Sequence, residues 1–371
     1  MAPMTATEPD RTMIGRPIAE LDTPALLLDE PAARRNMAKM SAFFRDKPCQ
    51  LRPHFKNHKC AELARRQLDA GSAVGLTCAK LAEAQVLVER GFDNILVANQ
   101  VVGPRKVQRL AELAGKATVR VAIDELAQAQ AIARAAAVAG STVELLIEVD
   151  IGMGRCGVQP GERLIELAGE LVKLEGVRFW GLQAFEGHTP YINDLAERRR
   201  AATTAIGRAL EARGLLEEAG IPIQGISGGA SANYAITGLI AGITELQCGT
   251  YVTMDWRYHQ VVPEFDVALS ILATVISRPD PDTAVLDFGV KGAGGEFGPP
   301  VVKRHPEAVV PSFLSEEHLI VRPAPPWKVG DVAELIPSHA CTTCNLYRQL
   351  YVHDGHSVVD VWPIEGSGCL T

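Results

Sequence analysis

Over most of the chain, short apolar segments alternate with longer segments in which Ala, Leu, Glu and Arg recur at helical spacing. This alternation predicts strands and helices in turn. The predicted strands are Leu51–Lys56, Ala73–Ala79, Asn94–Gln100, Thr118–Asp124, Val143–Asp150, Val177–Phe185, Pro222–Ala230 and Thr244–Val252. The predicted helices include Lys59–Ala70, Lys80–Arg90, Pro104–Ala114, Glu125–Ala139, Glu162–Lys173 and Asp194–Ala219. Eight strand–helix units in about 200 residues are typical of an α/β fold of the parallel (β/α)8 type.

A doubly wound open sheet is the alternative for such a pattern. No GxGxxG motif follows the first predicted strand, so this alternative lacks its dinucleotide-binding fingerprint. Glycines also follow the predicted helices, where helix C-caps commonly stand. They are Gly71, Gly91, Gly140, Gly176 and Gly220. The pattern therefore favours a (β/α)8 TIM-type barrel.

Beyond Tyr251 the pattern changes to strands separated by Pro, Gly and Asp turns. The predicted strands are Asp266–Ile276, Thr283–Phe288, Ala333–Ile336, Leu346–Val352 and Ser357–Trp362. We interpret this region as a second, mostly antiparallel β domain, to which Pro24–Leu28 adds a strand. The predicted organisation is a loose tail over residues 1–20, a barrel over residues 29–251, and a β domain made of residues 21–28 and 252–371.

Composition and charge exclude several classes of protein. Hydrophobic residues make up 47% and charged residues 22% of the 371 residues, which excludes a disordered chain. The net charge of −7, without a long Lys/Arg run, argues against nucleic acid or an anionic membrane as a partner. No apolar stretch reaches the length of about 18 residues that a membrane span needs. The N-terminal residues lack a secretory signal, and the scattered cysteines show no disulfide framework, so we expect a cytoplasmic location.

The first predicted barrel strand carries the first candidate for chemistry. Side chains alternate between the two faces of a strand, so Arg52, His54 and Lys56 are predicted to point into the barrel. Lys56 would then lie at the C-terminal mouth, where barrel enzymes keep their catalytic residues. Lysines in such places serve as Schiff-base nucleophiles, although a surface lysine at a strand end remains the ordinary alternative. Lys59 is expected to be solvated.

Two glycine-rich loops favour a cofactor with a phosphate group. They follow the seventh and eighth predicted strands, over Ile226–Tyr234 and Leu246–Tyr251. Barrels commonly bind phosphate there, because backbone N–H groups can approach a phosphate only where the side chains are small. A glycine turn alone is weak evidence, but two such loops together with an inward lysine indicate pyridoxal 5'-phosphate (PLP).

At this point the sequence resembles a known family, the PLP-dependent D-threonine aldolases and D-serine dehydratases of fold type III. The motifs that carry the resemblance are LDTP at 21–24, RPHFKNHK at 52–59, EVDIGMGRCGV at 148–158, GLQAFEGH at 181–188, SGGASANY at 227–234, ELQCGTY at 245–251, LDFGVKG at 286–292, EEH at 316–318 and PSHACTTCNL at 337–346. The resemblance implies a barrel like that of alanine racemase, a β domain and a homodimer.

The resemblance also implies roles for individual residues. It implies that Lys56 forms the Schiff base with PLP and that Arg155 lies near the 3-oxygen of the cofactor ring. It places the two glycine-rich loops on the phosphate and a divalent metal on His339 and Cys341. The predicted cofactor-binding residues are Lys56, Arg155, Gln183, Ser227, Gly228, Gly229, Ala230, Ser231, Gly249, Thr250 and Tyr251.

The residue types at the metal pair agree with that implication. On an extended segment, residues i and i+2 face the same way, so we expect the imidazole of His339 and the sulfur of Cys341 to face one ion. Imidazole and thiolate are ligands of zinc or another borderline-soft ion. The predicted cofactors are therefore PLP and one divalent metal, zinc or manganese. The alternative is a half-site made of Cys341 and Cys344, but no second CxxC completes it, so we interpret Cys344 as a buried thiol.

At two positions the sequence differs from the aldolases of the family that it resembles. The aldolases of the family carry Asp where this chain has Cys341, and His where it has Tyr191, whereas the His-x-Cys pair resembles the dehydratase branch. Either His188 or Tyr191 would then assist proton removal from the substrate hydroxyl. Other motifs resemble the aldolase branch more closely, so we predict an aldolase acting on a small β-hydroxy-D-amino acid. A D-serine or 3-hydroxyaspartate dehydratase is the close alternative, and an amino-acid racemase or a non-catalytic PLP carrier is more distant.

Overall fold

The computed structural model describes residues 9–371 and divides the chain into two compact units. We call them the β unit and the barrel unit. The β unit comprises residues 1–40, 57–63 and 250–368. The barrel unit comprises residues 41–56, 64–249 and 369–371.

The barrel unit contains eight parallel strands, which confirms the predicted fold class. They are β2 (Gln50–Leu51), β3 (Leu76–Cys78), β4 (Asn94–Gln100), β5 (Thr118–Ile123), β6 (Val143–Glu148), β7 (Val177–Ala184), β8 (Gly225–Gly228) and β9 (Glu245–Leu246). Their order in the sheet is β2-β9-β8-β7-β6-β5-β4-β3. Bridges from Leu51 to Ala73 and from His54 to Thr77 join the first strand to the β3 segment, so the sheet closes on itself.

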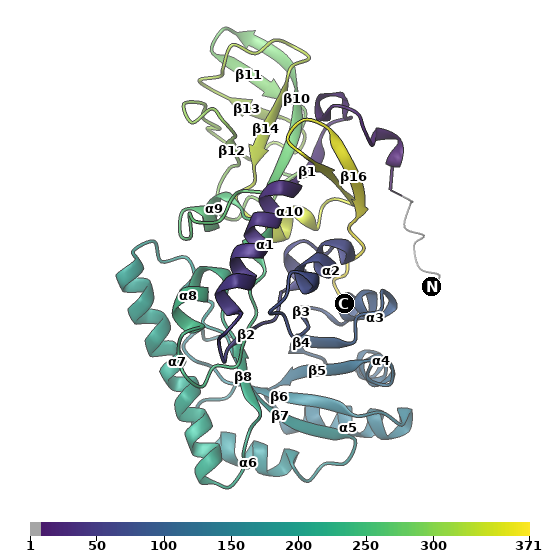
Figure 1. The fold of residues 1–371 in the computed structure, drawn as a ribbon, viewed down its shortest axis with the longest axis vertical. Helices are drawn as coiled ribbons and strands as arrows, with labels where there is room; N and C mark the ends of the chain where they lie inside the picture. The colour runs from purple at the N-terminus through teal and green to yellow at the C-terminus, as the bar shows by residue number, and fades with distance from the viewer. Residues whose placement is uncertain (1–8) are drawn as a thin grey trace. The chain divides into compact units, whose positions relative to one another are not determined.

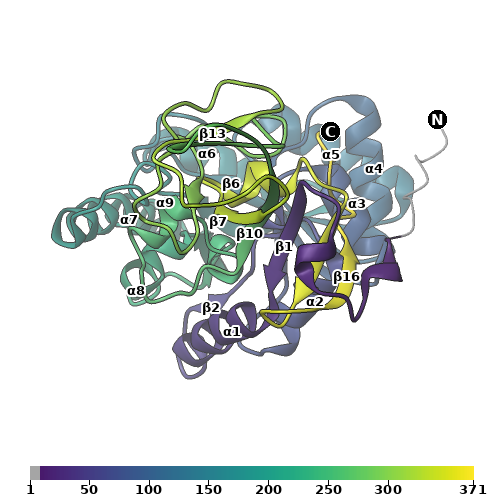
Figure 2. The same cartoon turned by 90° about the horizontal axis from the view of Figure 1, so that it is seen from above.

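Helices cover the outside of these strands, as in Figures 1 and 2. They include α3 (Leu81–Glu89), α4 (Pro104–Ala114), α5 (Leu126–Ala139), α6 (Glu162–Leu171) and α7 (Leu195–Glu218). The α4 helix has the predicted bounds, with Pro104 at its start, where a missing N–H costs nothing. Gly140 ends α5 in the left-handed conformation, with φ of 65°, as expected for a glycine C-cap.

The β unit is built on a mostly antiparallel sheet of order β12-β14-β10-β1-β15-β16, with β11 and β13 beside β10. The strands are β1 (Ala25–Asp29), β10 (Leu269–Asp280), β11 (Thr283–Leu286), β12 (Val301–Val302), β13 (Leu319–Val321), β14 (Val332–Ile336), β15 (Gln349–His353) and β16 (Val358–Pro363). The segment before the barrel does add a strand here, because β1 pairs with β10 and with β15. Leu27, Leu272 and Val361 are among the buried residues of its core.

The ends of the barrel strands differ from the prediction. The ladder of β2 is interrupted at Pro53, which has no N–H, and the chain turns into a 3-10 helix over Phe55–Asn57. Strand parity therefore does not place Lys56, which lies in this helix. The last strand ends at Leu246, and Thr250–Val252 forms another 3-10 helix.

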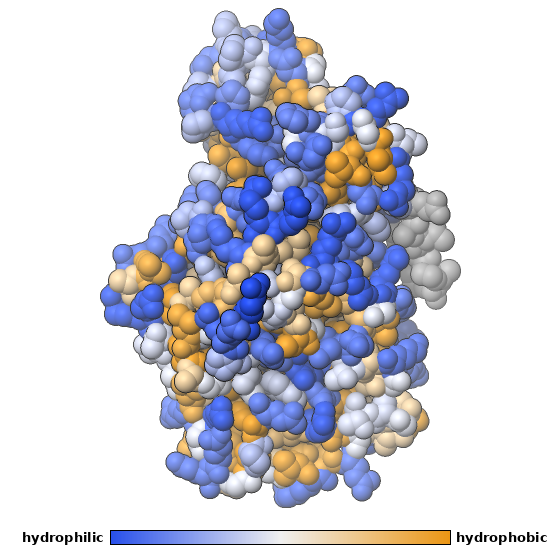
Figure 3. Space-filling model, in the orientation of Figure 1, coloured by the Kyte–Doolittle hydropathy of each residue, from blue (hydrophilic) through white to orange (hydrophobic). Residues whose placement is uncertain are grey.

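The prediction of a loose tail over residues 1–20 is wrong for its described part, and residues 1–8 lie outside the described residues. Gly15 N–H donates to Val358 O at 2.8 Å and Ile18 N–H donates to His356 O at 3.0 Å. These bonds fasten the segment to the start of β16. Within residues 9–371, no helix is long and apolar enough to cross a membrane. On the face drawn in Figure 3, hydrophilic residues cover most of the surface.

Candidate active site

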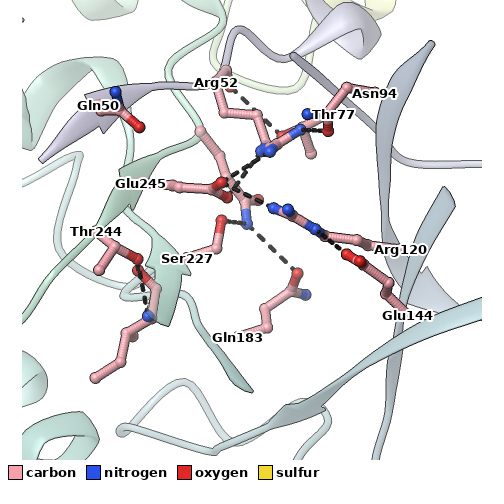
Figure 4. Close-up of polar contacts among 12 residues, drawn as sticks. Gln50, Arg52, Thr77, Asn94, Arg120, Glu144, Gln183, Ser227, Thr244 and Glu245 are labelled. Carbon is pink, nitrogen blue, oxygen red and sulfur yellow. Dashed lines mark hydrogen bonds and ion pairs between the residues drawn. The ribbon is translucent and has the colours of Figure 1, made fainter. Parts of the chain in front are cut away.

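The interior of the barrel unit carries a layer of paired charges (Figure 4). Arg52 is fully buried, and its guanidinium donates two hydrogen bonds to Glu245, at 2.8 and 2.7 Å. Arg120 joins Glu245 at 2.9 Å and Glu144 at 2.6 Å. Burial raises the pKa of Glu245, but Arg52 and Arg120 outweigh it and hold the pKa below its ordinary value. These charges satisfy one another, so we call Arg52, Arg120, Glu144 and Glu245 the ionic layer.

Two predicted cofactor-binding residues belong to a buried polar layer beside it. Gln247 Nε2 donates to Ser227 Oγ at 3.0 Å and to Gln183 Oε1 at 3.4 Å. All three side chains are buried. Gln183 and Ser227 therefore already have partners inside the barrel, and their contact with a cofactor remains a prediction.

Two cations share one aromatic ring at the end of β7. Lys56 Nζ lies 5.8 Å and the Arg155 guanidinium 5.6 Å from the centre of the Phe185 ring. Among the described residues, none forms an ion pair with Lys56 Nζ. Arg155 Nη2 lies 3.5 Å from Glu148, which also accepts a 2.7 Å hydrogen bond from Gln100. Lys56 and Arg155 thus both lie near the Phe185 ring, and their roles toward a cofactor stay predictions.

The loop that presents Arg155 is folded around a carboxylate. Asp150 Oδ1 accepts the N–H groups of Gly152 and Gly154, each at 3.0 Å, and these bonds help to hold the pKa of Asp150 below its ordinary value despite its desolvation. Burial raises the pKa of Glu148, and the hydrogen bond from Gln100 and the charge of Arg155 oppose this shift. Arg155 is therefore fixed both by its loop and by a buried acid.

The loop after β8 has the small residues that a phosphate needs, but packing explains two of the glycines. A Cβ on Gly228 would lie 1.8 Å from Ala184 O, and one on Gly229 would lie 2.0 Å from Leu246 Cδ2. Gly229 also has φ of 78°, which favours glycine. Within the described residues, no hydrogen-bond acceptor faces the N–H groups of Gly229 and Ala230. These two donors are what the loop offers to a phosphate.

The 3-10 helix after this loop (Ser231–Asn233) is held by hydrogen bonds to a buried carboxylate. Asn233 Nδ2 and Thr237 Oγ1 donate to Glu186 Oε1 at 3.2 and 2.7 Å, and all three residues are completely buried. The predicted phosphate residues on the second loop are Gly249, Thr250 and Tyr251. Thr250 and Tyr251 are buried, and Gly249 is partly buried.

His188 lines a cavity of the barrel unit. It lines an open cavity of about 520 Å³ together with Gly152, Arg200 and Arg208, and this lining includes neither Lys56 nor Arg155. A Cβ on Gly152 would lie 3.3 Å from the His188 ring. Tyr191 is partly buried three residues further along the same segment. The assignment of either residue to proton transfer stays a prediction.

The predicted metal ligands meet in the β unit, although the backbone between them is not extended. His339 is the N-cap of α10 (Ala340–Cys344), and Cys341 lies in the first turn of that helix. Cys341 nevertheless forms a side-chain hydrogen bond with the His339 ring. His339 Nδ1 donates to Glu296, which leaves Nε2 as the nitrogen for a metal. Burial lowers the pKa of His339, but Cys341, Asp255 and Glu296 together raise it to about 9.

The donor set fits a metal with two protein ligands. Within residues 9–371, no group of three or more His, Cys, Asp or Glu side chains could hold a metal, so water or a substrate would complete its coordination. Thr342 Oγ1 donates to Glu296 at 2.6 Å and fixes the carboxylate that orients His339. Burial raises the pKa of the Cys344 thiol well above its ordinary value, as expected for an inert buried cysteine.

Several residues of these sites were not predicted. Lys59, expected to be solvated, is only 7% exposed, and its carbonyl accepts the N–H of Gly366 at 2.9 Å. Phe185 and Glu148 lie within motifs that the sequence analysis quoted, but nothing in their spacing gives their roles. Glu296 stands in a glycine-rich segment more than forty residues before His339, and no local pattern links the two.

Comparisons with known proteins identify the family of the chain. Residues 28–256 match the family described as "Alanine racemase, N-terminal domain", and residues 268–353 match "Putative serine dehydratase domain". The chain is 37% identical to a D-threonine aldolase of Arthrobacter sp over 361 residues, which cover 95% of each protein. It is 31% identical to the D-threo-3-hydroxyaspartate dehydratase of Delftia sp. (strain HT23), over 87% of this chain and 92% of that protein. The crystal structure of D-threonine aldolase from Filomicrobium marinum matches with a TM-score of 0.92 and 34% identity, over 96% and 98% of the two chains.

Proposed function

The chain belongs to the family of D-threonine aldolases and D-serine dehydratases with an alanine-racemase-type barrel, and from this premise we propose that it is a PLP- and metal-dependent aldolase of β-hydroxy-D-amino acids. The observation that carries the proposal is the amine of Lys56, which lies over the ring of Phe185 and has no ion pair with a carboxylate among the described residues. The expected products are glycine and an aldehyde.

The residues at the mouth of the barrel unit fit PLP. Lys56 Nζ would hold it covalently, Arg155 would face the ring, and the N–H groups of Gly229 and Ala230 would bind the phosphate. When bound, PLP withdraws electrons from the bond at the substrate Cα that lies perpendicular to its ring. Glu148 keeps Arg155 in place through their ion pair, and Lys56 Nζ is the group that carries a proton to or from Cα.

His339 Nε2 and Cys341 Sγ would hold the divalent metal, zinc or manganese, and the thiolate favours zinc over harder ions. When bound, such an ion lowers the pKa of a hydroxyl that it contacts. Glu296 fixes the ring of His339, so that Nε2 is presented as an acceptor. His188 and Tyr191 are the candidates for accepting the proton of the substrate hydroxyl.

The choice between the aldolase and the dehydratase activity rests on how similar the chain is to relatives of each kind. The identity to the D-threonine aldolase is 37%, against 31% to the dehydratase, and the aldolase structure superposes with a TM-score of 0.92. Cys341 is the residue that favours dehydration, because the aldolases that this sequence resembles carry Asp at that position. We therefore keep the dehydratase as the second candidate function.

Product analysis separates the two. The purified protein is incubated with D-threonine and with D-serine, with and without a chelator, and the products are identified. Glycine and acetaldehyde from D-threonine support the aldolase. A 2-oxo acid and ammonia support the dehydratase, and interconversion of D- and L-isomers without cleavage would refute both.

We also propose that the enzyme is a homodimer in the cytoplasm. Enzymes of fold type III pair head to tail, and most soluble oligomers have twofold symmetry. Sedimentation during turnover tests the dimer, because a monomer that stays active at nanomolar concentration would contradict it. Fractionation of cells of the source organism tests the location.

A further inference from the structure

The amide of Asn57 lies against the sulfur of Cys341 within the β unit. Asn57 Nδ2 donates to Cys341 Sγ at 3.6 Å, and Asn57 Oδ1 accepts the hydroxyl of Thr253 at 2.7 Å. Asn57 is 1% and Thr253 0% exposed. Side chains so deeply buried need hydrogen-bond partners, so these three residues form one chain of hydrogen bonds that ends on the sulfur.

The protonation state of a metal-bound sulfur decides which groups donate and which accept in these hydrogen bonds. A cysteine sulfur that binds a metal has lost its proton and can only accept a hydrogen bond, so the amide must turn its N–H toward it. The amide oxygen of Asn57 then faces Thr253, whose hydroxyl is a donor. The flipped amide would place an oxygen against the sulfur, and two acceptors would face each other. The sulfur thus sets the orientation of the amide, and the hydroxyl of Thr253 supports it by donating to Asn57 Oδ1 at 2.7 Å.

Thr253 is itself fixed by the backbone. Its carbonyl accepts the N–H groups of Ala268 and Leu269, at 2.8 and 2.9 Å, where the chain enters β10. Its hydroxyl also lies 3.4 Å from Thr250 O. The donor that reaches Cys341 thus stands on a segment that has little freedom to move.

We propose that Asn57, held by Thr253, is a positioning residue for the metal. Its N–H orients the sulfur of Cys341 and strengthens the binding of a zinc-type ion by the pair His339 and Cys341. This inference rests on the metal site of the proposed function. Partners of metal ligands commonly change metal affinity 10–100-fold when removed. With only two protein ligands, no third side chain compensates for a ligand that is misplaced.

The test compares zinc affinity in matched variants of the PLP-loaded enzyme. Asn57→Leu keeps the branched shape of the side chain but removes the donor, Thr253→Val removes the hydroxyl at constant shape, and Thr253→Ser keeps the hydroxyl. Zinc affinity is measured by competition with a chromophoric chelator. We expect about 10–100-fold weaker binding in Asn57→Leu, a loss of about tenfold in Thr253→Val, and wild-type affinity in Thr253→Ser.

Two further readouts separate positioning from a general structural defect. With cobalt(II) in place of zinc, the thiolate-to-cobalt charge-transfer band should weaken or shift in Asn57→Leu and Thr253→Val, and it should be normal in Thr253→Ser. The PLP absorption band and the melting temperature of the metal-free protein should stay close to those of the wild type in Thr253→Val. Equal zinc affinity in Thr253→Val and Thr253→Ser would overturn the proposal, even if Asn57→Leu failed to fold.

His339→Ala separates this inference from the metal site itself. If His339→Ala binds zinc as tightly as the wild type, the metal assignment is wrong and the role of Asn57 is wrong with it. If His339→Ala loses zinc but Asn57→Leu and Thr253→Val keep wild-type affinity and spectra, the metal site stands and only the inference about Asn57 is wrong.

Discussion

Arg52 and Lys56 lie a few residues apart in the barrel unit, and their surroundings differ. Arg52 is completely buried and donates to Glu245 and Asn94, so its charge is neutralised where it stands. Lys56 is half-buried over the ring of Phe185 and has no ion pair with any described residue. The first arrangement leaves no group for chemistry, whereas the second leaves a reactive amine. A buried charge alone therefore does not mark a site, and Lys56 is the candidate because its amine lies over the ring of Phe185 without an ion pair among the described residues.

The β unit shows the same contrast. Lys303 Nζ donates to Glu334 at 2.6 Å, and Glu334 also accepts the hydroxyl of Ser270, so this pair is complete. His339 and Cys341 instead turn their ligand atoms toward each other, and the other nitrogen of His339 is held by Glu296. Glu296 and Cys341 thus orient the ring of His339, and this pair is the proposed metal site.

The largest effect is expected at Lys56. Lys56→Ala should abolish turnover of D-threonine and the visible absorption band of bound PLP, because the covalent link is lost. Its free energy of unfolding should change by less than about 1 kcal/mol, because Lys56 has no ion pair to lose. Absorption spectra, product assays and denaturant titration measure these quantities. Lys173→Ala, an exposed control, should leave all three unchanged. Full activity in Lys56→Ala would show that Lys56 does not hold PLP.

Removal of the metal should lower activity nearly as much as the substitution Lys56→Ala. A chelator, or the substitution His339→Ala, should abolish cleavage of D-threonine but leave the PLP band in place, because Lys56 holds PLP independently. Added zinc or manganese should restore the chelated wild type and not His339→Ala. Cys341→Asp should shift the metal preference toward manganese or magnesium. Turnover at the original rate after complete chelation would show that the metal assignment is wrong.

Substitutions in the ionic layer should have the opposite effect from those at Lys56. They should lower the free energy of unfolding and leave PLP binding intact. Glu245→Gln leaves Arg52 and Arg120 without their shared carboxylate, and breaking a buried pair costs about 3–5 kcal/mol. The folded fraction should keep its PLP band. Glu217→Gln removes the partner of Arg213 at an exposed helix position and should cost at most about 0.5 kcal/mol. Urea titration of both variants measures the difference, and equal costs would mean that burial is not the cause.

A smaller effect, on the pH dependence of the free energy of unfolding, is expected from His353 in β15. Burial lowers its pKa, its Nδ1 accepts the N–H of Gly355 at 3.0 Å, and its Nε2 is buried without a partner. Because the folded pKa lies below the ordinary value of 6.5, the unfolded chain binds the proton more tightly. The contribution of His353 to stability is therefore complete above pH 6.5 and is lost as the pH falls below it.

His353→Asn provides the matched variant, because its side-chain oxygen can accept the same N–H and does not titrate. The free energy of unfolding of the wild type should fall more between pH 8 and pH 5.5 than that of His353→Asn. Parallel losses in the two proteins would show that another group is responsible.

The elements that the sequence predicted well are those with strong periodicity. The α4 helix and strand β4 have the predicted bounds, since each carries a full amphipathic or apolar pattern of its own. The α10 helix was missed because ACTTC contains residues of low helix propensity, and its burial comes from distant segments. Residues 11–20 were missed for a related reason, because their bonds run to β16 at the other end of the sequence.

The candidate site was predictable only in its motif residues. Lys56, Arg155, His339 and Cys341 came from the resemblance, while the strand parity first used for Lys56 does not extend past His54. Glu296, Asn57 and Thr253 could not be found, because each meets its partner across a long stretch of sequence. Such contacts leave no spacing to detect in a single chain.

One measurement tests the central claim, that the unneutralised Lys56 and not its buried neighbour Lys59 holds the cofactor. The PLP-loaded enzyme is reduced with borohydride and digested, and the pyridoxyl-modified residue is located by mass spectrometry. The account predicts a single modified lysine at Lys56. A pyridoxyl group on Lys59, or on any other lysine in place of Lys56, would contradict it.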